Sequence, residues 1–245
     1  MPGPDTPRKQ FKEKIQGCEC DPEKGCGQGC LCLERYGPAY NETGKLDSVD
    51  PYHAMQKPIF ECNSTCKCGK ECFNRVVQKA VQVQLEVFET TMKGFGLRAG
   101  QNIGKNTFVC EYAGEVLTRE TAKIRTKALS EEENSNYYIF VLNEHPGSGQ
   151  TVTTNIDPMY VGNVARFINH SCEPNLYMVP VRIENSVPHL ALFALREIAI
   201  GEELTFDYSG TLQTHSPSSS VAPNGTIALM DSSAETNSES KAKRK

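Results

Sequence analysis

The chain has 245 residues, 38% of them hydrophobic, and a formal net charge of −4. This length allows one large domain with a smaller one beside it, and the charge gives no reason to expect bulk binding to nucleic acid. Because no run approaches the roughly 18 to 20 apolar residues of a membrane span, and no apolar segment near the start suggests a secretory signal, we expect an intracellular protein.

The first 13 residues are rich in Pro and in charged side chains, including Arg8, Lys9 and Lys12. Such a composition buries too little apolar surface to offset the entropy of ordering, so we predict a disordered N-terminus over residues 1–13. A short basic cluster like this one, or the one at residues 241–245, is more commonly a solvated tail than a nuclear-import signal.

Residues 14–77 are rich in cysteine and poor in core-forming side chains. A segment of this composition cannot fold on hydrophobic burial alone and requires cross-links or metal. In an intracellular chain metal is favoured over disulfides, and the odd total of 11 cysteines also argues against complete pairing. The candidate ligands are Cys18, Cys20, Cys26, Cys30, Cys32, Cys62, Cys66, Cys68 and Cys72.

Nine thiolates suit zinc if some sulfur atoms are shared. Two separate four-ligand sites would leave one cysteine over, and three separate sites would require twelve. If three sulfurs each bridge two ions and six bind one ion, each of three zinc ions has four sulfur ligands. Such a site has no open coordination position, so we predict a structural zinc module.

Residues 78–208 have the pattern of a different domain. Val83, Leu85 and Val87 alternate with polar residues, which predicts a half-buried strand, and apolar runs predict strands at 108–112, 137–142, 176–181 and 190–194. Thr118 can cap a water-facing helix that runs to Leu129 and carries Arg125. Many short strands and few helices predict a mostly β domain with small α content. Residues 209–245 are rich in Ser and Thr, which predicts a disordered tail.

Four stretches carry specific patterns: KGFGLRA around Gly94, CEYAGE at 110–115, RFINHSCEPN at 166–175 and GEELTFDYSG at 201–210. Taken alone, a glycine pair is more often an ordinary turn, and a single Tyr is more often a core aromatic. In this order, and behind the cysteine pattern, the stretches resemble SET-domain histone-lysine N-methyltransferases with a pre-SET zinc module. The stretches FECN and VPVRIENSVPHLALFA are most similar to a family member that is fused to a mariner transposase.

The resemblance implies a SET-domain fold of short β-sheets with a pseudoknot, over residues 78–208, after a loop-rich three-zinc pre-SET module. In the family, Cys18, Cys26 and Cys62 would bridge pairs of zinc ions. The three ions would be held by Cys18, Cys20, Cys26 and Cys30, by Cys18, Cys32, Cys62 and Cys66, and by Cys26, Cys62, Cys68 and Cys72.

The resemblance also implies transfer of a methyl group from S-adenosylmethionine to a lysine of histone H3, at lysines 4 and 36 in the most similar member and at lysine 9 in the wider group. The catalytic Tyr208 would orient the lysine amine. Tyr112 would line the lysine channel, although simple strand packing is an equal alternative, and Phe206 would favour di- or trimethylation. The cofactor would contact Lys93, Gly94, Phe95, Tyr137, Arg166, Asn169 and His170.

The match ends near residue 209. Family members with this pre-SET module carry three later cysteines that join the one equivalent to Cys172 around a fourth zinc, and this sequence has no cysteine after Cys172. We therefore expect no fourth zinc and a channel that lacks part of its wall. Two functions remain open. One is a monomeric methyltransferase of the nucleus and chromosome that binds the histone H3 tail or nucleosome. The other is a weak or inactive variant that acts as a chromatin- or DNA-associated interaction module.

Overall fold

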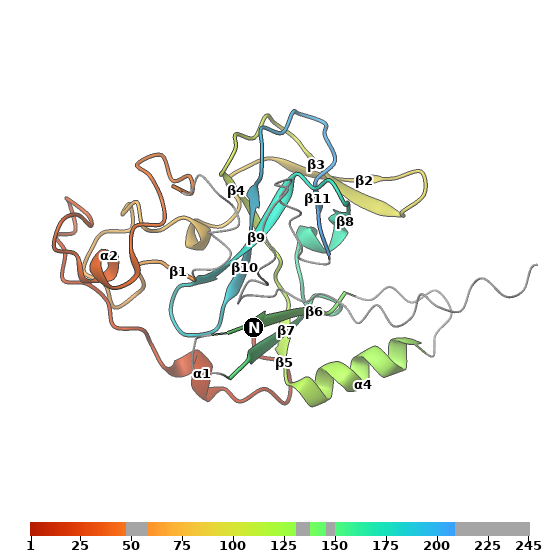
Figure 1. The fold of residues 1–245 in the computed structure, drawn as a ribbon, viewed down its shortest axis with the longest axis horizontal. Helices are drawn as coiled ribbons and strands as arrows, with labels where there is room; N and C mark the ends of the chain where they lie inside the picture. Colours follow the sequence, from red (N-terminus) through yellow and green to blue (C-terminus); the bar gives the residue numbers. More distant parts are fainter. Residues whose placement is uncertain (48–57, 131–137, 146–149, 209–245) are drawn as a thin grey trace, which may run out of the picture.

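The computed structural model describes residues 1–47, 58–130, 138–145 and 150–208 (Figure 1). The predicted tail at 209–245 lies outside these ranges. Within them the chain is mostly β, with small sheets and few helices, which confirms the predicted fold class. Among the residues that the structure describes, no helix is both long and apolar enough to cross a membrane.

The cysteine-rich part forms loops with four short elements: α1 (Lys9–Lys12), α2 (Leu31–Tyr36), β1 (Ile59–Phe60) and the 3-10 helix η1 (Val77–Lys79). The part that follows contains most of the strands: β2 (Leu85–Glu89), β3 (Phe95–Ala99), β4 (Phe108–Glu111), β5 (Glu115–Leu117), β6 (Phe140–Glu144), β7 (Val152–Asp157), β8 (Asn169–His170), β9 (Leu176–Arg182), β10 (His189–Ala194) and β11 (Thr205–Phe206). It also contains helix α4 (Arg119–Ser130) and the 3-10 helix η2 (Val164–Phe167).

The largest sheet has the strand order β1-β9-β10-β4 and is covered on both faces. Side chains alternate between the faces of a strand, so consecutive residues of β10 belong to different cores. Leu190 and Leu192 pack with Val109 in one core, whereas Ala191 and Phe193 pack in the other. All of these side chains are buried, which explains why β9 and β10 appear in the sequence as nearly continuous apolar runs.

The second core joins the cysteine-rich part to the sheet. Tyr40, Leu46, Ile59 and Val77 pack there against residues of β9 and β10 such as Phe193. In addition, β1 pairs in parallel with β9. The cysteine-rich part therefore supports one face of the central sheet, and Figure 1 shows it beside that sheet.

The Glu61 carboxylate lies at this junction and is 2% exposed. It accepts hydrogen bonds from the backbone N–H groups of Val76 (2.9 Å) and Val77 (2.7 Å). It also accepts from the Tyr40 hydroxyl (2.8 Å) and from Nε2 of Gln78 (2.8 Å). One buried acid thus satisfies donors from both the loop around Tyr40 and the start of η1.

We expect Glu61→Ala to lower the free energy of unfolding by about 3 kcal/mol or more, because each buried donor left without an acceptor costs about 1–3 kcal/mol. Glu61→Gln keeps one acceptor oxygen and should cost less. Denaturant unfolding followed by circular dichroism measures both. The control is Glu71→Ala, which removes an exposed carboxylate paired with Lys79 and should change stability little. Equal losses in the two alanine variants would contradict the assigned role.

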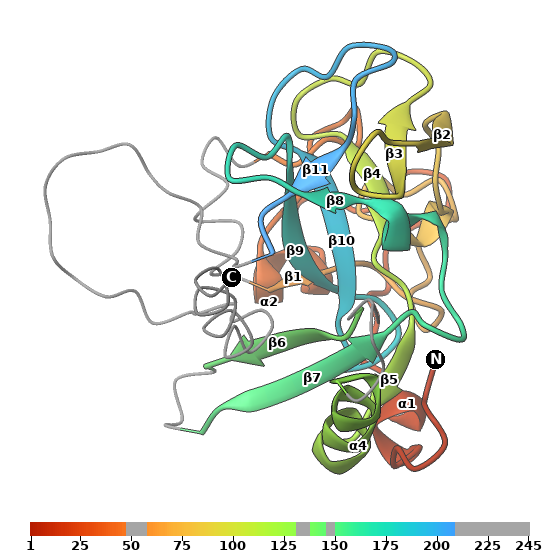
Figure 2. The same cartoon turned by 90° about the vertical axis from the view of Figure 1, so that its right-hand side faces the viewer.

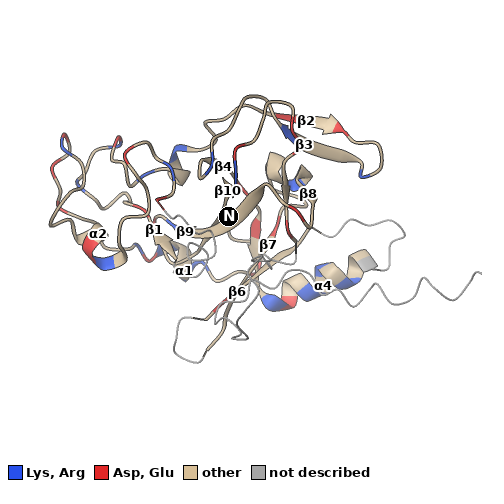
Figure 3. Cartoon of the chain, turned by 45° about the horizontal axis from the view of Figure 1, so that its top comes forward, with Lys and Arg blue, Asp and Glu red and all other residues tan. Residues whose placement is uncertain are grey.

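A second sheet, of order β5-β7-β6, packs against α4. The Thr118 hydroxyl accepts a hydrogen bond from the backbone N–H of Thr121 at 3.1 Å, which confirms the predicted helix cap. Arg125 differs from the water-facing prediction, because it donates to Glu115 (2.8 Å) and to buried Asp157 (2.7 Å). In Figure 3, positions occupied by Lys or Arg recur along α4.

The N-terminal residues are placed against β5, which differs from the predicted disorder of residues 1–13. The backbone N–H of Gly3 donates to the carbonyl of Val116 at 2.9 Å, and the N–H of Val116 donates to the carbonyl of Met1 at 2.7 Å. Phe11 packs against the main core. Composition alone does not reveal this arrangement, because the open edge of β5 pairs with backbone groups, which every residue type supplies.

Candidate active site and cysteine cluster

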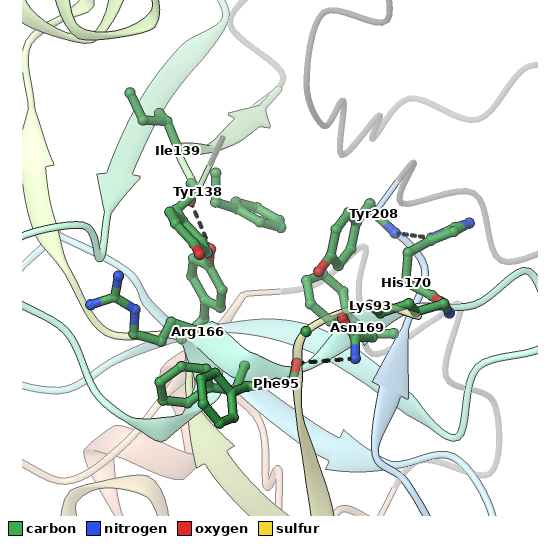
Figure 4. Close-up of a pocket in the computed structure, with 13 residues that line it drawn as sticks. Lys93, Phe95, Tyr138, Ile139, Arg166, Asn169, His170 and Tyr208 are labelled. Atoms are coloured by element: carbon green, nitrogen blue, oxygen red, sulfur yellow. Dashed lines mark hydrogen bonds between the residues drawn. The ribbon is translucent and has the colours of Figure 1, made fainter. Parts of the chain in front are cut away.

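A pocket of about 440 Å³ forms where five segments meet (Figure 4). These segments are the β2–β3 hairpin, Tyr112 after β4, residues 138–140 at the start of β6, the stretch from η2 to β8, and the stretch that ends at Tyr208. Figure 2 shows β8 and β11 next to each other above the three-stranded sheet. The pocket is lined by Lys93, Gly94, Phe95, Tyr112, Tyr138, Ile139, Phe140, Arg166, Phe167, Asn169, His170, Phe206 and Tyr208.

The hairpin turn presents Lys93 and Phe95 to the pocket. Gly94 has φ +68°, a backbone conformation that costs glycine little and other residues more. Thr90 stabilises the turn, since its hydroxyl accepts from the Lys93 N–H at 2.8 Å and donates to the Gly94 carbonyl at 2.8 Å. The Lys93 ammonium in turn donates to the His170 carbonyl at 3.1 Å, which ties the hairpin to β8.

Arg166 supplies a second cation to the pocket. Its guanidinium lies over the rings of Tyr138 (5.0 Å) and Phe167 (5.8 Å). One nitrogen donates to the Met159 carbonyl at 3.2 Å, while the buried Nε has no partner among the residues described. Figure 4 shows Arg166 and Lys93 on different sides of the pocket, Arg166 beside Tyr138 and Lys93 beside His170.

The parallel pairing of β8 with β11 brings the RFINHSCEPN and GEELTFDYSG stretches together. Thr205 lies opposite Asn169, and Phe206 lies opposite His170. His170 accepts a hydrogen bond at Nδ1 from the Tyr208 N–H at 3.1 Å. The contact fixes the backbone of Tyr208 and occupies the ring nitrogen that would otherwise be available as a base.

Aromatic rings line much of the pocket. The Phe206 ring lies 6.2 Å from Tyr112, 6.4 Å from Phe140 and 4.7 Å from Tyr208. The Tyr112 hydroxyl donates to the Tyr138 carbonyl, and the Tyr208 hydroxyl donates to the Ile168 carbonyl, each at 2.7 Å. Burial raises the pKa of Tyr208 to about 12 and that of Tyr112 further, so both hydroxyls are neutral at physiological pH.

The residues that the sequence singled out therefore line one pocket, with one exception. Tyr137 lies outside the described residues. The sequence did not single out four other lining residues: Tyr138, Ile139, Phe140 and Phe167. The run of residues 137–140 is apolar throughout, so alternation could not show which side chains face the pocket.

The sulfur atoms of the cysteine-rich part converge, and all 11 cysteines are free. Sγ–Sγ distances are 3.6 Å for Cys18–Cys26, 3.4 Å for Cys26–Cys62 and 3.8 Å for Cys32–Cys66. A tetrahedron with Zn–S bonds of about 2.3 Å has S–S edges of about 3.8 Å. The spacing of these soft ligands therefore suits zinc.

Three groups of four sulfurs lie within 4.8 Å of one another: Cys18, Cys20, Cys26 and Cys30; Cys18, Cys32, Cys62 and Cys66; and Cys18, Cys26, Cys62 and Cys68. The first two are ligand sets expected from the sequence, and the last contains Cys18 where Cys72 was expected. N–H groups of Asn63 (3.2 Å) and Cys18 (3.4 Å) donate to the Cys66 sulfur, and Arg75 donates to the Cys68 sulfur at 3.5 Å.

Comparison with known proteins agrees with this geometry. A model of the SET domain matches residues 94–209, and a model of the Pre-SET motif matches residues 4–75. The crystal structure of the methyltransferase domain of human histone-lysine N-methyltransferase SETMAR superposes with a TM-score of 0.72 and 43% identity, over 86% of this chain and 72% of that one. The chain belongs to the SET-domain histone-lysine N-methyltransferase family. The pocket is thus enclosed by segments of its SET domain, and the cysteine cluster lies in its Pre-SET motif.

Two further matches bear on the site. Mouse SETMAR is 49% identical over 210 residues, which are 85% of this chain and 66% of the relative. The chain spans less than two thirds of the rat, mouse, human and bovine SETMAR proteins. A structure of KRYPTONITE in complex with mCHH DNA, H3(1-15) peptide and SAH has a TM-score of 0.64 at 30% identity, over 88% of this chain and 40% of that one.

Proposed function

We propose that this chain transfers the methyl group of S-adenosylmethionine to a lysine amine of histone H3. The observation that carries the proposal is the pocket itself, which is lined both by two cations, Lys93 and Arg166, and by aromatic rings. The cations suit the amino-acid tail of a methyl donor, and the rings suit a long alkyl side chain that carries an amine. The KRYPTONITE complex with H3 peptide and SAH supports the same assignment.

We assign binding of the donor to the residues singled out in the sequence. The cationic side chains of Lys93 and Arg166 suit the carboxylate of the amino-acid tail, and Nε of Arg166 has no partner among the residues that the structure describes. Phe95 and Phe167, whose rings are 5.9 Å apart, offer an apolar surface to a flat base. When bound, S-adenosylmethionine supplies an electrophilic methyl group on a sulfonium and leaves as a neutral thioether.

We assign the aromatic side chains of Tyr112, Phe206 and Tyr208 to the substrate lysine. A free lysine has a pKa of about 10.4 and must lose its proton to become a nucleophile. A channel of buried rings favours the neutral amine, and the rings hold the alkyl chain in one direction. The Tyr208 hydroxyl lies at the rim of this channel, where it can orient the amine toward the methyl group.

We further propose that the cysteine cluster holds three structural zinc ions, with Cys18, Cys26 and Cys62 as shared ligands. The central position of these three sulfurs in the converging groups supports the sharing. Residues 14–77 would then form the zinc module and residues 78–208 the catalytic domain. The ions would supply cross-links and take no part in methyl transfer.

The proposed partner is the H3 tail, alone or in the nucleosome, and the proposed location is the nucleus and chromosome. Lysines 4 and 36 of histone H3 are the first candidates, because the chain resembles SETMAR over most of its length. Peptides that carry lysine 4, 9 or 36 as the only acceptor distinguish the alternatives.

Calorimetric titration of the zinc-loaded protein with S-adenosylmethionine tests the proposed cofactor. We expect binding of one ligand per chain, and weaker binding of methylthioadenosine, which lacks the amino-acid tail that Lys93 and Arg166 would hold. ATP is the control for non-specific binding of adenine. Absence of binding by S-adenosylmethionine, or equal binding of all three compounds, would overturn the assignment.

The product state should depend on Phe206. Phe has no hydroxyl and leaves room beside the amine, so we expect di- or trimethylated lysine from the wild type and mainly monomethylated lysine from Phe206→Tyr. Mass spectrometry of a modified H3 peptide measures the distribution. Phe193→Tyr adds a hydroxyl to the second core, away from the pocket, and serves as a control. A wild-type product that is only monomethylated would contradict the prediction.

A further inference from the structure

The amide of Asn169 is held in one orientation by two acceptors. Its Nδ2 donates to Oε1 of Glu203 at 2.9 Å and to the carbonyl of Phe95 at 3.3 Å. A carboxylate and a carbonyl only accept, so the nitrogen must face them. Because the two atoms of an amide lie at opposite ends of its plane, Oδ1 of Asn169 is turned away from Glu203.

Glu203 is itself fixed by backbone contacts. It forms an isolated antiparallel bridge with Arg98 of β3. The next residue, Leu204, donates its N–H to the Leu97 carbonyl at 2.7 Å. On the other side, the Asn175 side chain donates to the Glu203 carbonyl at 2.8 Å. The carboxylate thus projects from a backbone that has little freedom to move.

The second glycine of the KGFGLRA stretch leaves space for this carboxylate. A Cβ at Gly96 would lie 3.1 Å from Oε1 of Glu203, and 2.9 Å from atoms of Phe88 and Thr90. Gly96 has no positive φ, so conformational freedom does not explain it. The close approach of Phe88, Thr90 and Glu203 explains it.

We propose that Glu203 is a positioning residue for the methyl donor, acting through Asn169. The Glu203 carboxylate orients the Asn169 amide so that Oδ1 of Asn169 accepts a hydrogen bond from the ammonium group of the methyl donor. Lys93 and Arg166 bind the carboxylate of the donor. Glu203 does not line the pocket and touches no reacting atom. This inference rests on the function proposed above, because it requires a ligand with an ammonium group.

The test compares Glu203→Ala and Glu203→Gln with the wild type by calorimetry. Loss of one hydrogen bond to a well-oriented group lowers affinity about tenfold. We therefore expect Glu203→Ala to bind S-adenosylmethionine about tenfold more weakly than the wild type. Gln offers one acceptor oxygen and should recover most of the affinity. In turnover, the KM for the donor should rise, whereas kcat at saturating donor and the KM for the peptide should change little.

A second ligand separates positioning from attraction between the Glu203 charge and the sulfonium. S-adenosylhomocysteine has the same ammonium group but lacks the sulfonium charge. Positioning through Asn169 predicts equal losses for the two ligands, whereas attraction between the Glu203 charge and the sulfonium predicts a larger loss for the sulfonium compound. Glu86→Ala removes an exposed carboxylate from the neighbouring strand β2 and is the matched control.

Three outcomes decide the matter. Equal losses for both ligands in Glu203→Ala, recovered in Glu203→Gln at an unchanged melting temperature, support the inference. Affinities within twofold of the wild type, or a larger loss for the sulfonium compound, overturn it and leave the proposed function intact. If the wild type binds neither ligand, the proposed function fails and the inference fails with it.

Discussion

Removal of zinc is expected to unfold the cysteine-rich part and to destabilise the central sheet. The core of that part consists almost entirely of cysteines, with partly buried side chains such as Leu31, Leu33 and Phe73 around it. Structural zinc typically contributes about 10 kcal/mol or more to the folding of such small modules. Because Tyr40 and Ile59 cover one face of β9 and β10, their loss should also lower the melting temperature of the catalytic part.

A chelator titration with a zinc-sensitive dye, followed by circular dichroism, measures this effect. Cys26→Ala should release zinc and lower the melting temperature strongly. Cys110→Ala is the matched control, since Cys110 is equally buried but lies in the main core, away from the cluster. The idea would be refuted by protein that melts at the same temperature with and without metal, or by equal zinc content in the two variants.

Tyr208→Phe is expected to reduce methyl transfer by about 100-fold or more, a loss typical of removing a group that orients or exchanges protons with the reacting atoms. The variant keeps the ring and loses only the hydroxyl, which donates to the Ile168 carbonyl. Stability should fall by about 1 kcal/mol for that hydrogen bond. Donor affinity should change little.

The pH dependence of the same reaction can be derived from burial. Burial raises the pKa of Tyr208 to about 12, so its hydroxyl stays protonated at lower pH. The rate should therefore rise with pH as the substrate amine loses its proton, and Tyr208 should add no descending limb below its own pKa.

The matched control for Tyr208→Phe is Tyr177→Phe, which removes the hydroxyl of a buried tyrosine outside the pocket. If both Tyr variants lost activity equally, the role of Tyr208 would be structural.

Strands with strong apolar patterns could be predicted from the sequence. The runs at 108–112, 176–181 and 190–194 became β4, β9 and β10 with ends shifted by a residue or less. These strands are buried, so hydrophobicity alone identifies them. The strand expected around Val83 begins later, at Leu85, and Val87 is 37% exposed, since β2 lies in a two-stranded ribbon with little to cover it.

Other elements left too weak a signal to be predicted. The strands β1, β8 and β11 have two residues each. The longer β7 contains buried Asn155 and Asp157, whose polar groups are satisfied by the Leu117 carbonyl and by Arg125. A buried polar strand looks exposed in sequence, because its partners come from distant parts of the chain.

The same limit applies to the site. Lys93, Asn169 and Tyr208 could be proposed because their motifs resemble a known family, and the structure places them around one pocket. The hydrogen bond between Glu203 and Asn169 could not be predicted from the sequence, because it depends on which residues of two distant segments face each other. Spacing along a chain does not contain that information until the strands are paired.

The mass of a histone H3 tail peptide, after incubation with the zinc-loaded protein and S-adenosylmethionine, is the most direct test of the central claim. The account predicts methylated lysine with the wild type and unmodified peptide with Tyr208→Phe. Unmodified peptide after incubation with wild-type protein that contains zinc and binds the donor would contradict it.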